Sequence, residues 1–229
     1  MTSFEQLLTI REHMLNRNSP MNNQKEKLIS ATERLLCSRG LACVSTRDIA
    51  HAAKVAEGAL YHHFDDKAEL ILSVVLHQLG DFPEVLRSLP LQVGQKTVQK
   101  NLGRVLGSAF AFHYRIAPLV CSLFADQELL VRVRSMMHER SMGPGRTTSV
   151  IAAYLRAEQQ LGRVLSAAVP ETVADLMLAV SFNTALRDHF FCGGSGGEAK
   201  AQRQLREAVR ALVVGLGPRD GARRAREKR

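Results

Sequence analysis

The sequence predicts an all-α protein with two helical domains. Apolar residues recur every three or four positions along most of the 229 residues, which is the spacing of one face of a helix. No segment shows a convincing alternation of apolar and polar residues, the pattern of a half-buried strand. The chain is long enough to bury two modest cores, and capping residues, glycines and prolines mark where helices start and stop.

The first expected helix begins near Asn23 and stops at Gly40. Its apolar positions fall at helical spacing, at Leu28, Ile29, Thr32, Leu35 and Leu36. A later helix begins at Asp66, with Glu69 as a capping-box partner three residues on, and continues to Gly80. Between them lie two shorter helices.

Residues 45–64 predict two short helices joined by a tight turn, a helix-turn-helix. Ser45 is the expected N-cap of the first, with Asp48 as its weaker capping-box partner and Ile49, Ala50 and Ala53 as its buried face. The second extends from Glu57 to His63. Leu60 and Phe64 are four residues apart and therefore anchor one face of this helix, which leaves the other face free.

Beyond Gln95 the helical pattern continues with little interruption. The expected segments are 97–116, 118–124, 126–141, 147–162, 172–191 and 198–216. Pro83 and Pro90 mark a change of composition before them. The glycines of 192–197 predict a flexible connection, and Gly217-Pro218 ends the folded part. The resulting division is an N-terminal arm (1–20), a helical head (21–80), a larger helical domain (81–217) and a basic tail (218–229).

The charge distribution favours an anionic partner but does not place it on the head. The formal net charge is +9, yet residues 21–80 carry seven basic and seven acidic side chains. Residues 219–229 carry six basic and two acidic ones. Any affinity of the head for phosphate must therefore come from placed contacts, backbone amides and helix N-termini rather than from bulk charge.

Several function classes find no support in the sequence. No apolar segment approaches the length of a membrane span and no secretory signal precedes the first helix, so we expect a soluble cytoplasmic protein without membrane partners. Glycine-rich phosphate loops, nucleophile elbows and metal motifs are absent, so we expect no cofactor, no metal and no enzymatic activity. The four cysteines are expected to be buried, reduced thiols.

The helix-turn-helix supplies the candidate DNA-binding residues. Small residues at the start of a recognition helix allow close approach to base edges in the major groove, and Gly58 and Ala59 meet that need. Polar side chains on either side of this contact are expected to bind DNA phosphates. They are the hydroxyl, cationic and imidazole groups of Thr46, Arg47, Tyr61, His62 and Lys67. Glu57 could accept a hydrogen bond from a cytosine amino group. Of the adjacent pair His62-His63, one is expected to face DNA and the other to pack inward.

Three blocks of sequence carry a family resemblance. They are Ser45-Thr46-Arg47-Asp48-Ile49-Ala50, Gly58-Ala59-Leu60-Tyr61-His62-His63-Phe64 and Lys67-Ala68-Glu69-Leu70. This pattern, over about residues 23–75, resembles the N-terminal domain of TetR-family transcriptional regulators. The resemblance implies an all-helical homodimer whose heads bind a palindromic operator in double-stranded DNA. It also implies that residues 81–217 bind a small effector, which typically releases the DNA, and mediate dimerisation.

The sequence departs from the family pattern at three positions. Lys54 stands where the turn often has Gly, Ala56 where Ser often caps the recognition helix, and Glu57 where Lys or a neutral residue is common. The missing cap should cost about 1 kcal/mol of helix-end stability. These changes bear on the operator sequence rather than on the mode of binding.

Candidate effector and dimer residues come from the C-terminal half. A pocket for an apolar or aromatic effector could be lined by Phe110, His113, Tyr114, Phe124, Met137, Tyr154 and Phe182. Each of these residues could instead fill the core. Two apolar helix faces match the four-helix dimer interface that the resemblance implies. They comprise Leu176, Ala179, Val180 and Asn183 on one helix and Leu205, Ala208, Val209 and Leu212 on the other, with intrachain packing as the alternative.

The sequence thus predicts a sequence-specific DNA-binding transcriptional regulator, a repressor released from its operator by a small molecule. A non-specific DNA-binding protein is the alternative from another class, and a helical enzyme is the less favoured one. Binding to random DNA distinguishes the first two, because a specific regulator prefers its operator over random DNA by roughly 10³ or more.

Overall fold

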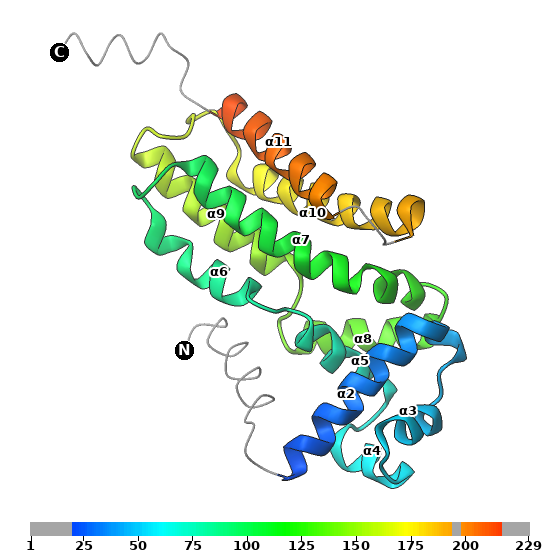
Figure 1. The fold of residues 1–229 in the computed structure, drawn as a ribbon. Coiled ribbons are helices and arrows are strands. Elements are labelled where there is room, and N and C mark those ends of the chain that lie inside the picture. Colours follow the sequence, from blue (N-terminus) through cyan, green and yellow to red (C-terminus); the bar gives the residue numbers. More distant parts are fainter. Residues whose placement is uncertain (1–19, 194–197, 217–229) are drawn as a thin grey trace, which may run out of the picture. The chain divides into compact units, whose positions relative to one another are not determined.

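The computed structural model describes residues 20–193 and 198–216, and every regular element in these ranges is a helix (Figure 1). The predicted all-α class is therefore confirmed. The expected basic tail lies outside the described residues, as do residues 1–19 of the expected arm. No helix in the described part of the chain is long and apolar enough to cross a membrane.

The described residues form two compact units. Unit 1 contains the residues up to Gly80 together with Arg115–Met142, and unit 2 contains Asp81–Tyr114 and the residues from Gly143 onward. The expected division at residue 80 placed 115–142 in the larger domain. The structure groups them with the head because five apolar side chains from this segment join the core of unit 1, namely Leu119, Leu123, Leu129, Val133 and Met136.

Unit 1 contains the helix-turn-helix. Its helices are α2 (Pro20–Arg39), α3 (Thr46–Ala53), α4 (Glu57–His63), α5 (Lys67–His77) and α8 (Gln127–Glu139), with the short 3₁₀ turn η1 (Leu41–Cys43) before α3. α2 packs against α3 and α5, and α5 packs against α8. Leu28, Ile49, Leu60, Leu70 and Ile71 are completely buried where these helices meet. This core fixes α3 and α4 on one side and leaves their other faces outside.

Unit 2 is built from longer helices. They are α6 (Phe82–Ser88), the first part of α7 (Val98–Leu123), α9 (Pro144–Gln160), α10 (Pro170–Cys192) and α11 (Glu198–Leu216), with η2 (Pro90–Gln92) after α6. α9 packs along α10, and α10 packs against α11. The sequence indicated only a change of composition where α6 lies. This helix is seven residues long, too short for a clear periodicity, and its start is marked by Pro83 in the first turn.

The helix starts at α9 and α10 are also set by proline. The structure begins them at Pro144 and Pro170, each a few residues earlier than the apolar pattern indicated. Proline fits the first turn of a helix because the amide that it lacks would have no intrahelical partner there.

The predicted break at Pro118 is wrong, because α7 continues through it to Leu123. A proline inside a helix removes the amide that would bond the carbonyl four residues earlier, here that of Tyr114. His189 of α10 lies with its Nε2 atom 2.8 Å from this carbonyl oxygen. Since a carbonyl only accepts, the imidazole donates through Nε2 and replaces the missing bond.

We predict that His189→Leu lowers the free energy of unfolding by about 1–3 kcal/mol, the cost of losing this hydrogen bond to the Tyr114 carbonyl. In a Pro118→Ala background an amide returns at position 118, so the same change should cost less. Urea unfolding of the four proteins in this double-mutant cycle measures the difference. Phe191→Leu, at a nearby position that is 75% exposed, is the control. An equal cost of His189→Leu in both backgrounds would contradict this role.

Candidate nucleic-acid interface

Local hydrogen bonds start α3 at the predicted residue. The Ser45 hydroxyl oxygen accepts from the Asp48 amide at 3.2 Å, and the Asp48 carboxylate accepts from the Ser45 amide at 2.9 Å. The capping box is therefore confirmed, and hydrogen bonds from Ser45 lower the pKa of Asp48. Ile49, Ala50 and Ala53 are buried as expected.

The turn between α3 and α4 requires a left-handed residue at Lys54. Its φ of 56° and ψ of 44° are the values that usually select glycine, which agrees with the departure noted in the sequence. The Lys54 and Val55 amides donate to the carbonyls of His51 and Ala50, at 3.1 and 3.0 Å, and so close the end of α3. The angle between the two helices is thus fixed by backbone bonds despite the unfavourable residue.

α4 is held by its buried face rather than by a cap. Ala56 provides no side-chain cap, as the sequence indicated, whereas Leu60 and Phe64 are almost fully buried. His62 is exposed and His63 is half-buried beside the Phe64 ring. His63 is therefore the histidine of the pair that packs inward, and the contact of His62 with DNA stays a prediction. Burial and the nearby Lys25 lower the pKa of His63.

The outer faces of α3 and α4 bring most of the predicted residues together. Arg47, Glu57, Gly58, Tyr61 and His62 are exposed, while Thr46 and Ala59 are half-buried. The Tyr61 hydroxyl lies 3.4 Å from the Thr46 hydroxyl, which joins the two helices at this surface. Tyr61 is 56% exposed, a large value for an aromatic residue in a well-packed unit.

Glu57 is paired in a way that the sequence did not indicate. The Nε atom of Arg47 lies 3.3 Å from its carboxylate, and both side chains are well exposed. An exposed pair of this kind contributes at most about 1 kcal/mol, so it can open when phosphate approaches. Until then it neutralises the one acidic side chain on the exposed face of α4.

Lys67 has a structural bond that differs from its expected role. Its ammonium group donates to the Val44 carbonyl at 2.9 Å and is half-buried, so it fastens the start of α5 to the residues that precede α3. The contact with phosphate predicted for Lys67 would have to use the remaining donors of the same group.

Two arginines, Arg132 of α8 and Arg140 directly after it, complete the fixation of α5. Arg132 donates to the Asp66 carboxylate at 2.8 Å, and Arg140 donates to that of Glu69 at 3.0 Å. The other Asp66 oxygen caps α5 by accepting from the Glu69 amide at 2.8 Å. Burial opposes ionisation of Asp66, but these hydrogen bonds outweigh it and lower its pKa. The sequence could not reveal the two arginines, because they lie 66 and 71 residues from their partners.

The aromatic residues predicted to line an effector pocket are only partly brought together. In unit 2 the Phe110 and Tyr114 rings lie 5.5 Å apart, and the His113 ring meets the edge of Phe182 at 5.6 Å. They pack as core between α7 and α10. Tyr154 is buried elsewhere, where its hydroxyl accepts from Asn101 at 3.0 Å.

Two of the predicted pocket residues are wrong. Phe124 is 65% exposed, and Met137 packs against the core of unit 1 rather than with the aromatic residues of unit 2. Both belong to the segment 115–142, which the structure assigns to unit 1. Composition identified the aromatic residues but could not say which helix faces they occupy.

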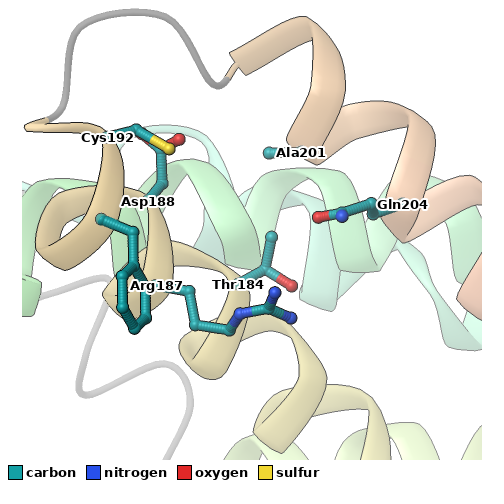
Figure 2. A pocket seen from close by; sticks show the side chains of 7 residues that line it. Thr184, Arg187, Asp188, Cys192, Ala201 and Gln204 are labelled. Carbon is teal, nitrogen blue, oxygen red and sulfur yellow. The ribbon is translucent and has the colours of Figure 1, made fainter.

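Three cavities are present in the described part of unit 2. The one between α10 and α11 measures about 130 Å³. Figure 2 shows it, with Thr184, Arg187 and Asp188 along α10 and Ala201 and Gln204 along α11. A second, between α6 and α7, measures about 220 Å³. Both are smaller than the roughly 300–1,000 Å³ of ordinary ligand sites. The third, between α7 and α11, measures about 640 Å³ and falls within that range.

The predicted dimer residues divide between the surface and the interior. Leu176, Ala179 and Asn183 of α10 are exposed, and Val180 is half-buried. Leu205 and Val209 of α11 are instead buried within their own chain, and Ala208 and Leu212 are half-buried. The intrachain alternative is therefore correct for Leu205 and Val209, because the apolar face of α11 is turned inward.

The cysteines also differ from expectation. Cys37, Cys43, Cys121 and Cys192 are all exposed rather than buried, and none forms a disulfide with another. In the described part of the chain no group of three or more His, Cys, Asp or Glu side chains could hold a metal ion.

The sequence profile of "Bacterial regulatory proteins, tetR family" matches residues 28–74, from α2 through α5. This match includes the capped α3, the left-handed turn and the exposed face of α4. Residues 28–74 therefore match the DNA-binding region of the TetR family.

Two TetR-like relatives show how far the sequence similarity extends. The helix-turn-helix transcriptional regulator YerO of Bacillus subtilis is 28% identical over 90 residues, which are 39% of this chain and 31% of that protein. The transcriptional repressor KstR2 of Rhodococcus jostii is 35% identical over 63 residues, which are 28% of this chain and 31% of KstR2. The chain thus matches less than a third of the length of either relative.

The fold of the described residues is similar to that of solved TetR-family proteins. A TetR-family regulator from Mesorhizobium loti superposes with a TM-score of 0.68 over 88% of this chain and 100% of that one. The two sequences are 18% identical, so this likeness concerns the fold alone. The family and the relatives are regulators rather than enzymes, as the sequence indicated.

Acid stability should depend on His113. Burial lowers the pKa of this residue from 6.5 to about 4, and its Nδ1 atom lies 2.8 Å from the Ser181 hydroxyl. Between these pH values the unfolded chain binds a proton that the folded chain does not, so stability falls as the pH decreases from 6.5 to about 4. We predict that His113→Asn reduces this loss, measured by urea unfolding at about pH 7 and about pH 4.5.

His62→Asn, at an exposed position, is the control and should keep the wild-type pH dependence. An identical pH dependence for His113→Asn and the wild type would contradict the buried, neutral state of His113.

Proposed function

We propose that this protein is a sequence-specific DNA-binding transcriptional regulator that acts as a repressor. The observation that carries the proposal is the outer face of α4. Leu60 and Phe64 fix one side of this helix in the core, and Gly58, Tyr61 and His62 remain exposed on the other. KstR2 of Rhodococcus jostii, which is 35% identical to this chain over 63 residues, is a transcriptional repressor, and this supports repression as the sign of regulation.

The geometry supports insertion of α4 into the major groove. Gly58 has no neighbouring atom within 4 Å of where a Cβ would lie, so the backbone at the start of the helix is open to a close approach by base edges. Thr46 at the start of α3 and Tyr61 on α4 offer two adjacent hydroxyls to phosphate oxygens. Because the head is neutral, these placed contacts supply the affinity.

Specific recognition is tested by selecting an operator from a pool of random DNA. We predict that the selected site is palindromic and binds roughly 10³ times more tightly than random DNA of the same length at about 0.15 M salt. Equal affinities for the two DNAs would favour the non-specific binding protein instead.

We predict that Tyr61→Ala weakens operator binding by roughly tenfold to a hundredfold, the value of a hydrogen bond to a charged group. Its helix content should stay that of the wild type, because the ring is exposed. Fluorescence anisotropy with labelled operator measures the affinity, and circular dichroism checks the fold. Phe124→Ala is the matched control, as an exposed aromatic residue of the same unit. Loss of folding in Tyr61→Ala would show that the ring belongs to the core.

We further propose that the protein is a homodimer that pairs through α10. Exposed residues recur along this helix at alternating spacings of three and four, at Leu176, Ala179, Asn183, Leu186 and Phe190. This spacing is the seam of a pair of helices that pack at a shallow angle. Leu176, Leu186 and Phe190 are 49, 37 and 79% exposed, so the described part of the chain leaves them accessible. A twofold dimer would supply two α4 helices for a palindromic operator.

We predict that Leu186→Glu converts the dimer to a monomer, because two carboxylates would meet at the seam. Sedimentation velocity measures the mass, and the operator affinity should fall with it, since one head contacts one half-site. Leu91→Glu, at a position that is 77% exposed, is the control and should remain dimeric. A dimer that persists in Leu186→Glu would place the interface elsewhere.

We propose that a small effector releases the DNA, as the sequence indicated. The aromatic cluster of α7 and α10 is filled by its own side chains and hydrogen bonds. The groove between α7 and α11 is the described cavity whose volume suits an effector.

A further inference from the structure

We propose that the groove between α7 and α11 binds amphipathic carboxylates, molecules with an anionic head and a linear apolar chain, and that these are the effectors of the regulator. The effector role rests on the function proposed above, whereas binding in the groove does not. Three features of the groove support this class of ligand: its open glycine face, its apolar wall and its basic rim.

Two glycines create the open volume. Gly103 and Gly107 of α7 are four residues apart and so lie on one face of the helix, which lines the groove. A Cβ atom at either position would meet nothing within 4 Å. Glycine is a poor helix former, and a pair on one face usually lets two helices pack closely. Here α11 does not fill the space, so the glycines leave room for a ligand.

The groove has an apolar wall of suitable length. Leu106 of α7 and Leu205 and Val209 of α11 line it, and all three are otherwise buried. Its α7 side extends from Thr97 to Gly107, which corresponds to about 15 Å of helix at 1.5 Å per residue. A groove of this shape accommodates an extended alkyl chain better than a compact ring system.

The rim of the groove is positively charged. Lys100 of α7 and Arg206 of α11 both line it, and none of the described lining residues is acidic. Neither cation forms an ion pair within the described residues. Exposed cations beside apolar surface recognise a carboxylate whose chain lies in the groove.

The α7 side of the groove is also rigid. The Asn101 side chain, next to Lys100, donates to the carbonyls of Gln92 and Gln95 at 3.3 and 3.0 Å and to the Tyr154 hydroxyl at 3.0 Å. These bonds fasten the start of α7 to the preceding loop and to α9. A preformed wall costs a ligand little ordering on binding.

The test uses the full chain and isothermal titration with decanoate below its micelle concentration. We expect saturable binding to the wild type, and a loss of at least roughly tenfold in affinity for Gly107→Leu, whose side chain would occupy the groove. Gly145→Leu is the matched control, because a Cβ there also meets no atom within 4 Å but lies away from the groove. Thermal melting should show Gly107→Leu folded, since leucine favours a helix more than glycine does.

A second pair of variants tests the basic rim. Arg206→Gln should weaken decanoate binding by roughly tenfold and leave the binding of uncharged decanol unchanged. Arg203→Gln, an exposed arginine of α11 outside the groove lining, should behave like the wild type. The proposed site would be overturned by absence of decanoate binding, by equal affinities of Gly107→Leu and Gly145→Leu, or by equal effects of Arg206→Gln and Arg203→Gln.

The effector role is measured separately, by adding decanoate to the operator complex. We expect decanoate to weaken operator binding by the wild type and to have no effect on Gly107→Leu. Binding of decanoate without any change in operator affinity would overturn the effector role. Operator affinity in the absence of decanoate reports on the DNA-binding function itself, so failures of the two proposals can be told apart.

Discussion

The first turn of α5 is the constraint on which the candidate DNA-binding surface depends. Asp66 caps this turn and accepts from Arg132, while Glu69 accepts from Arg140, so α8 is fastened to α5 at two points. Lys67, between them, holds a backbone carbonyl just before α3. The Glu69 pair is the better shielded from solvent of the two and is therefore the stronger. Contacts from Arg132, from Arg140 and from the backbone just before α3 thus meet at the first turn of α5, which adds to the buried core in holding α3.

The three proposed binding surfaces differ in the interactions that they offer to a partner. The surface of α3 and α4 has no excess of charge, so the DNA affinity that we propose for it would come from hydroxyl groups and a close backbone approach. The seam of α10 uses exposed apolar side chains, with Asn183 among them. A polar residue at such a seam can select register and partner at some cost in stability. The groove of α7 and α11 combines apolar surface with two uncompensated cations, which suits a small amphipathic molecule better than DNA or a second copy of the chain.

Short-range signals made the head predictable from the sequence. The capping box of Ser45 and Asp48 and the anchoring pair on α4 each involve residues within a few positions of each other, and the structure agrees with both. Contacts between distant segments could not be predicted. Pro118 should have ended a helix, and it does not because His189, more than seventy residues later, supplies the missing donor. The aromatic residues were assigned to a pocket by composition, which does not determine the direction in which a side chain points.

The central claim is that the contacts of α5 with α8 hold the DNA-binding helices in place. Hydrogen exchange of the full chain, compared between Arg140→Gln and the wild type, tests it most directly. Arg134→Gln is the control, because Arg134 is an exposed arginine of α8. Local opening is reported by the exchange rate of each amide. We predict that Arg140→Gln accelerates exchange of the amides of α3 and α4, while Arg134→Gln leaves them at the wild-type rate. Equal protection of α3 and α4 in all three proteins would contradict the claim.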